Sequence, residues 1–175
     1  MSTRPSGISP WGVAGLYFLA AILIFWPLAD LVTNTWPMQW GDFRWRYGFA
    51  GLLGGFHLTP LFGYVLAMYV AIWLRHAHVL RLVSVSGFAA LLALGLVMVM
   101  FPLDTIQVRS GRPPEGLQAL TAGAIIAEAK HFTTAVALLL LSVGSWGSAN
   151  RIATGAAPAS SRPGQPGVII RPDPR

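Results

Sequence analysis

The chain has 175 residues, enough for one domain, and 54% of them are hydrophobic while only 10% are charged. Roughly a quarter of the residues are charged in an average soluble domain, and a soluble core of this size could not bury so much apolar surface. The formal net charge of +6 comes mainly from arginines scattered one or two to a loop, which disfavours a nucleic-acid-binding patch, and the lack of cysteine excludes disulfides, thiol redox chemistry and cysteine-ligated metal centres.

Four apolar stretches are long enough to cross a lipid bilayer, since a spanning helix needs roughly 20 mostly apolar residues. The first stretch follows Arg4 and resembles a signal peptide at its start, but it runs too long and no clean small-residue cleavage site follows it, so we expect it to be retained. We therefore predict an all-α, four-helix transmembrane bundle over residues 11–147, after a cytoplasmic N-terminus at residues 1–10. The expected spans are residues 11–32, 47–74, 80–103 and 117–146.

The loop between the first two spans, "NTWPMQWGDFRWR", is rich in aromatic and basic residues. Such a segment is typical of chain that lies along the lipid headgroups. We expect the following residues to anchor the protein at this interface: Trp36, Trp40, Arg44, Trp45 and Arg46.

The arginines and tryptophans also predict an orientation. With the N-terminus in the cytoplasm, seven of the eleven arginines lie on the cytoplasmic side and four on the outer side, as the positive-inside rule favours. Tryptophans then form an inner belt (Trp11, Trp73, Trp146) and an outer belt (Trp36, Trp40, Trp45). We expect both ends of the chain in the cytoplasm and the protein in a bacterial inner membrane.

Small residues predict close helix packing on two of the spans. Gly51 and Gly55 lie four positions apart on the second span, and Pro60 is expected to kink it, as Pro27 is expected to kink the first. On the fourth span a ridge recurs every four positions and includes a histidine: Ala119, Gly123, Ala127, His131 and Ala135.

Ionisable residues recur at one depth of the predicted bundle. His57 lies sixteen positions from Trp73 and His131 lies fifteen from Trp146, which correspond to about 24 and 22 Å along the two helices. Both imidazoles are therefore expected in the outer half of the membrane. Together with neighbouring acids and a lysine, they make up a predicted intramembrane polar cluster: Asp30, His57, Asp104, Glu128, Lys130 and His131.

Three interpretations of this cluster are open. In the first, the cluster is structural and its side chains form hydrogen bonds between helices. In the second, His57 and His131 are axial ligands of a haem or another tetrapyrrole. In the third, the cluster is a path for protons, quinone or a small solute. Glu128 and His131 have the Glu-x-x-His spacing of di-iron bundles, but such a centre needs two copies and two further glutamates, and the chain has one copy.

The remaining sequence carries no catalytic motif and no nucleotide-binding fingerprint. Residues 148–175 are rich in Pro, Gly and Ser, which predicts a disordered cytoplasmic tail. The leading hypothesis is a non-enzymatic accessory or scaffold subunit of a larger membrane complex, with lipid and protein partners and no nucleic acid. The alternatives are a tetrapyrrole-binding redox protein and a transporter of protons or small solutes.

Overall fold

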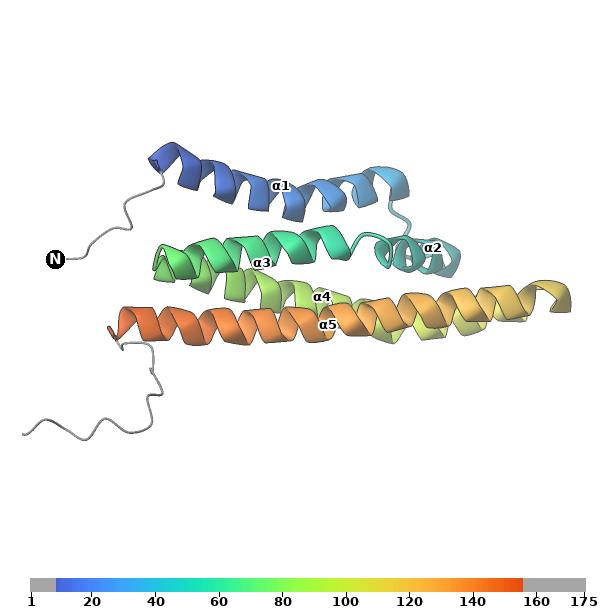
Figure 1. Ribbon diagram of the computed structural model, residues 1–175. Helices are drawn as coiled ribbons and strands as arrows, with labels where there is room; N and C mark the ends of the chain where they lie inside the picture. Colours follow the sequence, from blue (N-terminus) through green and yellow to red (C-terminus); the bar gives the residue numbers. More distant parts are fainter. Residues whose placement is uncertain (1–8, 156–175) are drawn as a thin grey trace, which may run out of the picture.

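The computed structural model describes residues 9–155, and all regular structure in that range is helical (Figure 1). The order is α1 (Pro10–Thr35), α2 (Phe43–Leu53), α3 (Leu58–Trp73), α4 (Ala77–Ser110), the short 3-10 turn η1 (Pro114–Gly116) and α5 (Leu117–Ala153). The all-helical prediction is confirmed for the described residues. The predicted tail lies outside them from residue 156 onward, and α5 itself continues past the expected boundary at residue 147.

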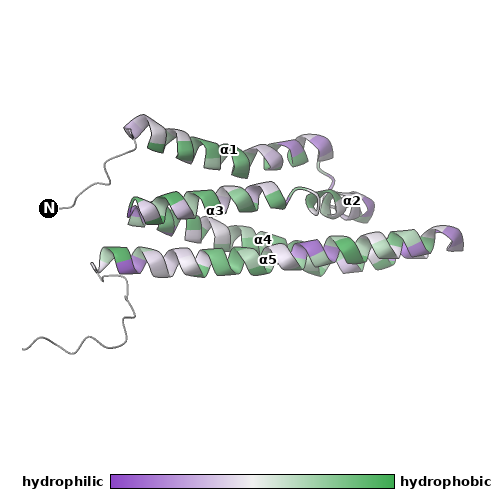
Figure 2. Ribbon diagram, in the orientation of Figure 1, coloured by the Kyte–Doolittle hydropathy of each residue, from purple (hydrophilic) through white to green (hydrophobic). Residues whose placement is uncertain are grey.

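Three of these helices, α1, α4 and α5, are each long and apolar enough to span a membrane. Helices α2 and α3 qualify only as a pair, and a bend of 51° separates their axes. The structure therefore has three candidate spans, or four if the bent pair counts as one. Hydrophobic residues recur along the length of the long helices (Figure 2). Many of the large ones are exposed, so the chain has the character of a membrane protein.

The second predicted span, expected as one helix over residues 47–74, is broken in the structure at residues 54–57. Gly54 and Gly55 explain the break, because glycine is a poor helix former and two in succession weaken the helix at one point. Pro60 lies in the first turn of α3, where its missing N–H costs no helical hydrogen bond. The proline is therefore compatible with the start of a helix rather than being the cause of a kink within one.

Helix α3 lies in the middle of the molecule. Helix α1 contacts α3 and α2 but neither α4 nor α5, while α4 and α5 form a long antiparallel pair on the other side (Figure 1). At the crossing of α1 and α3, a Cβ atom added to Gly63 would lie 2.9 Å from the carbonyl oxygen of Ala20. The absence of a side chain at Gly63 is what lets these two helices approach so closely.

The buried face of α5 follows spacings of three and four positions, similar to those of a coiled coil, and not the strict four-residue ridge expected from the sequence. Ala119 and Gly123 of the expected ridge are exposed. A strict four-residue spacing drifts around the helix, whereas a mean spacing of 3.5 stays against a long partner helix. The buried residues are Ala124, Ala127, His131, Thr134, Leu138, Ser142, Ser145 and Ala149.

Candidate functional site

Two histidines that are far apart in the sequence meet where α2 and α3 separate. His57 is the residue directly before α3, and His131 is fully buried on α5. The Nε2 atom of His57 lies 2.6 Å from the Nδ1 atom of His131, and the ring planes are inclined by 76°. One nitrogen of this hydrogen bond donates a proton and the other accepts it, so at least one of the two imidazoles is neutral at this contact.

Aromatic side chains from α2 and α4 enclose the buried histidine. The ring of Phe101 meets His131 edge to face, with centroids 5.8 Å apart, and Tyr47 stacks on Phe101 at 5.3 Å. Gly54, in the break, packs against Ala127 on α5, since a Cβ atom added to this glycine would lie 3.7 Å from the Cα atom of Ala127. The close helix packing that was expected at Gly51 and Gly55 does not form there. A Cβ atom at Gly51 would meet nothing within 4 Å, and Gly55 lies in the break.

A second polar contact joins α2 to α4. Both oxygens of the buried Asp104 carboxylate accept hydrogen bonds from the guanidinium of Arg46, at 3.0 Å from Nε and 2.6 Å from Nη2. The remaining Nη1 group donates to the carbonyl oxygen of Trp40 at 2.8 Å. This two-pronged geometry is the strongest form of ion pair between these side chains, and it fixes the tilt of α2 against α4.

The predicted interface anchors divide into two groups. Trp36, Trp40 and Arg44 are exposed, as a lipid-facing anchor must be. Trp45 instead donates its indole N–H to the carbonyl oxygen of Thr35 at 2.9 Å and packs against Trp40, so these residues tie the loop to α1. The guanidinium of Arg46 is engaged in the ion pair with Asp104.

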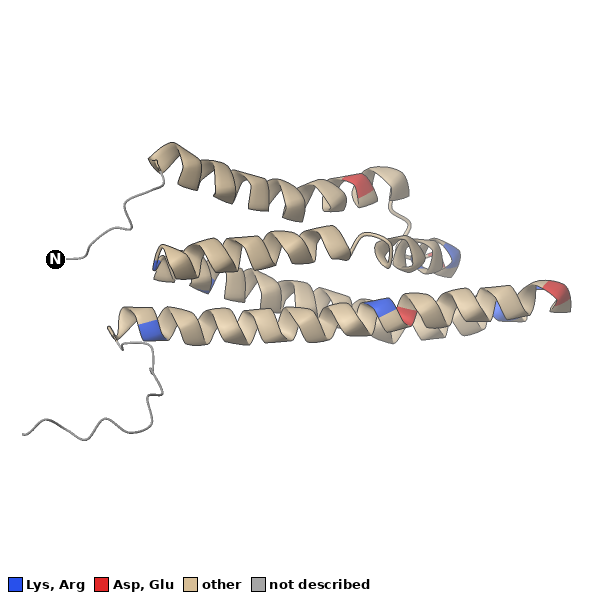
Figure 3. Ribbon diagram, in the orientation of Figure 1, with Lys and Arg blue, Asp and Glu red and all other residues tan. Residues whose placement is uncertain are grey.

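The six residues of the predicted polar cluster are not gathered at one place. His57 and His131 are in contact, but Asp104 pairs with Arg46 and not with Lys130. Glu128 is partly buried, with one carboxylate oxygen that has no hydrogen-bond partner among residues 9–155. Lys130 is exposed, and so is Asp30 on α1, which does not contact α5. Figure 3 shows how few charges lie between the ends of the long helices.

The Arg46–Asp104 pair was not anticipated from the sequence. The sequence places Arg46 at the lipid interface and Asp104 in the intramembrane polar cluster, because their contact depends on the 51° bend between α2 and α3, which the sequence does not reveal. The two adjacent glycines at the break are the feature of the sequence that could have indicated a bend. The apolar run around them, however, is typical of one continuous span.

The histidine pair does not fit a tetrapyrrole held between its two rings. Two axial imidazoles must lie on opposite faces of the macrocycle with the iron between them. Here the two nitrogens are in direct hydrogen-bonding contact, and the rings enclose no space. Within the described part of the chain, no group of three or more histidine, aspartate or glutamate side chains is placed to hold a metal ion.

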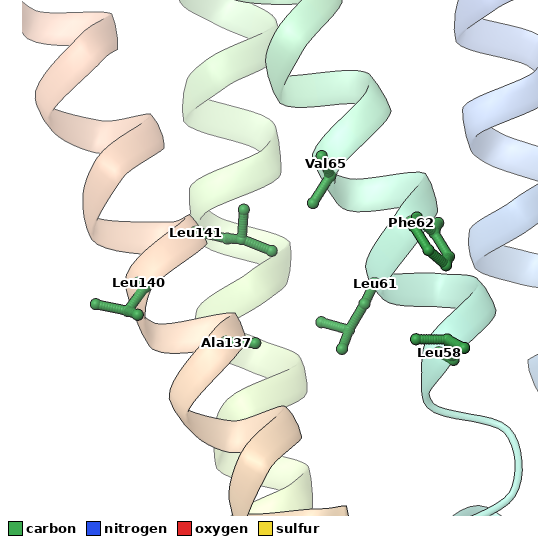
Figure 4. Close-up of a pocket in the computed structure, with 7 residues that line it drawn as sticks. All are labelled: Leu58, Leu61, Phe62, Val65, Ala137, Leu140 and Leu141. Carbon is green, nitrogen blue, oxygen red and sulfur yellow. The ribbon is translucent and has the colours of Figure 1, made fainter.

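An apolar groove of about 340 Å³ lies between α3 and α5, beginning at Leu58, the residue after His57 (Figure 4). Its walls are formed by aliphatic and phenyl side chains such as Leu61, Phe62 and Leu141. None of the lining side chains can donate or accept a hydrogen bond. The groove therefore adds no chemistry to the histidine pair.

Comparison with known proteins assigns the chain to no family: no family model, no curated protein and no solved structure matches it at a significant level. The function must therefore be argued from the chain's own residues.

Proposed function

We propose that this protein is a non-enzymatic accessory or scaffold subunit of a larger membrane complex, and that α1 is the helix that meets the partner. The observation that carries the proposal is the isolation of α1. It packs on α3 and touches α2, its Tyr17 hydrogen-bonds to His76 in the turn before α4, and the rest of its surface makes no contact with α4 or α5. Only 11% of its most apolar stretch is buried within the molecule, against 22% and 28% for α4 and α5.

The open side of α1 is unusually aromatic. Phe18, Phe25 and Trp26 are each about two-thirds exposed, although they lie in the middle of the helix, away from the interfaces where tryptophan normally gathers. Large, rigid aromatic side chains are enriched at protein–protein contacts because they bury much area at little entropic cost. A partner helix would cover this face.

Asp30 adds a polar argument to the same face. It lies six positions before Trp36, so it is about 9 Å deeper in the membrane than that tryptophan, and its side chain is exposed. A carboxylate that faces acyl chains is costly, and such residues normally turn towards protein. Exposed Thr33 and Asn34 lie beside it, which makes this end of α1 a polar patch suited to a hydrogen-bonding partner.

The proposed setting is a bacterial inner membrane, crossed four times, with both ends of the chain in the cytoplasm. From Trp11 to Trp36 the length along α1 is about 38 Å, close to the ~40–45 Å of a bilayer with its headgroups. At the end of the molecule opposite α2, the described residues include Arg75, Arg81 and Arg151 and no acid. A basic end of this kind supports the cytoplasmic side.

A photo-crosslinking amino acid at position 26 tests the proposal in the membranes of the native host. Position 92 on α4 is the matched control, since Leu92 is also strongly exposed and apolar. We expect a discrete protein adduct from position 26, lipid adducts alone from position 92, and loss of the protein adduct in an Asp30→Leu background. Lipid adducts alone at both positions, together with migration as a single chain in native gels, would refute the proposal.

A further inference from the structure

A polar groove lies at the α2 end of the molecule, apart from the histidine pair and from the open face of α1. It has a volume of about 420 Å³ and runs between the first turns of α2 and the last turn of α4. Its polar lining comes from both helices and from the turn after α4: Arg44, Tyr47, Gln107, Ser110 and Arg112.

The groove is positively charged. Two guanidinium groups, Arg44 and Arg112, line it from different segments, and no carboxylate does. Of the acids close to these arginines in the sequence or on the facing helix, Asp42 accepts the backbone N–H of Arg44 as the cap of α2 and Asp104 is paired with Arg46. Glu115, three residues after Arg112, does not line the groove. Among the described residues neither Arg44 nor Arg112 forms an ion pair.

The walls of the groove are held in place before any ligand binds. The Arg46–Asp104 ion pair joins α2 to α4 one turn below the groove, and the stacking of Tyr47 on Phe101 joins the same helices again. Two fixed walls keep the arginines near each other despite their mutual repulsion. A preformed site loses less entropy when a ligand binds, which raises its affinity.

Arginine side chains favour phosphate, because the planar guanidinium matches two phosphate oxygens at once. We propose that this groove binds a phosphate group, and that a phospholipid headgroup carries it. Arg44 is followed directly by Trp45, whose ring packs with Trp40 and Phe49 in an aromatic cluster typical of the headgroup level. The Arg44 guanidinium therefore lies where lipid phosphates are most concentrated.

The site does not depend on the partner proposed for α1. The test uses full-length protein in a neutral detergent, titrated with short-chain phosphatidylglycerol, with glycerol phosphate and with the matching diacylglycerol, which lacks phosphate. We expect the wild type to bind the phospholipid at one site and to ignore the diacylglycerol. Arg44→Gln combined with Arg112→Gln should weaken binding at least about tenfold, as expected for lost charged hydrogen bonds.

Arg109→Gln is the matched control, because Arg109 is an exposed arginine in the last turn of α4, three residues before Arg112, and lines a different groove. The affinity of this control should equal that of the wild type. Arg44→Lys combined with Arg112→Lys should bind with intermediate affinity, since lysine keeps the positive charge but cannot bind two phosphate oxygens at once as a guanidinium does. An unchanged affinity in the double Gln variant, or an equal loss in Arg109→Gln, would overturn the site. Equal affinity for glycerol phosphate and phospholipid would keep the phosphate site and overturn the lipid as its source.

Discussion

His57 and His131 are 74 positions apart in the sequence, yet their imidazole nitrogens lie 2.6 Å from each other. The contact ties the break between α2 and α3 to the middle of α5. Because His131 is fully buried, water cannot replace its partner, and the hydrogen bond is worth more here than on a surface. The hydrogen bond between the two histidines is therefore expected to hold the bent α2–α3 segment against α4 and α5.

Removal of either histidine should destabilise the fold, and the two effects should not be additive. His57→Ala leaves a buried imidazole nitrogen of His131 without a partner, which costs about 1–3 kcal/mol. His131→Ala costs more, because it also leaves a cavity beside Phe101. A double-mutant cycle on the unfolding free energy in mixed micelles should give a coupling of about 0.5–1.5 kcal/mol.

The control for this cycle is His78→Ala, because His78 is exposed in the first turn of α4. Its unfolding free energy should stay within about 0.5 kcal/mol of the wild type. Additive losses in the His57 and His131 variants would show that the two rings do not interact in the folded protein.

Loss of Arg46 should be among the most damaging single changes at the α2 end. Asp104 is 1% exposed, so Arg46→Gln would leave its carboxylate buried without a counter-charge, at a cost of about 3–5 kcal/mol. Arg46→Lys should lose less, since the charge remains but the two-pronged contact does not. The measurement is the midpoint of thermal unfolding in detergent.

A double variant tests whether the loss of stability comes from the unpaired charge or from changed packing at the site. Arg46→Met together with Asp104→Leu removes both charges, and it should be more stable than Arg46→Gln alone. Arg44→Gln serves as the control, because Arg44 lies two positions from Arg46 on the opposite side of α2 and is exposed. This variant should unfold as the wild type does. A double variant less stable than either single change would contradict the ion pair as the source of the effect.

The depth of the two histidines could be predicted from the sequence, but their contact could not. Counting residues from the tryptophans put His57 and His131 at one level, because rise per residue is a fixed property of a helix. Which way a ring points depends on the rotation of each helix about its axis. That rotation is set by packing, for example by Gly54 against Ala127, and no single-span pattern encodes it.

The place of α1 was likewise beyond the sequence. A soluble helix shows its buried side as an apolar stripe, but α1 is apolar almost all round, as a lipid-facing helix must be. Nothing in its pattern reveals that Ala20 and Leu31 are buried while Phe25 and Trp26 remain open. Asp30 was expected in a polar cluster for the same reason. Its depth along α1 could be predicted from the sequence, but the side of the helix to which it points could not.

The close crossing of α1 and α3 should fail when Gly63 gains a side chain. In Gly63→Ala the new methyl group would meet the carbonyl oxygen of Ala20 at 2.9 Å and a side-chain carbon of Ile24 at 2.6 Å. Backbone cannot give way as a flexible side chain can, so the helices must separate. We expect a loss of about 1–3 kcal/mol in unfolding free energy.

Gly95→Ala on α4 is the matched control, since a Cβ atom there would meet nothing within 4 Å. It replaces glycine by a better helix former without a clash, so it should be neutral or slightly stabilising. Because α1 has no contact with α4 or α5, Gly63→Ala should also expose α1 to protease more than it exposes α5. Equal stability of the two variants would place α1 elsewhere.

The orientation can be measured directly, because the chain has no cysteine and any introduced thiol is unique. Gly111→Cys lies in the exposed turn after α4, and Thr154→Cys lies at the exposed end of α5. With both termini in the cytoplasm, a membrane-impermeant maleimide applied to intact cells should label Gly111→Cys and leave Thr154→Cys unlabelled. Permeabilised cells should give equal labelling of both, which controls for reactivity. The reverse pattern in intact cells would invert the topology and place Arg44 and Arg112 on the cytoplasmic leaflet.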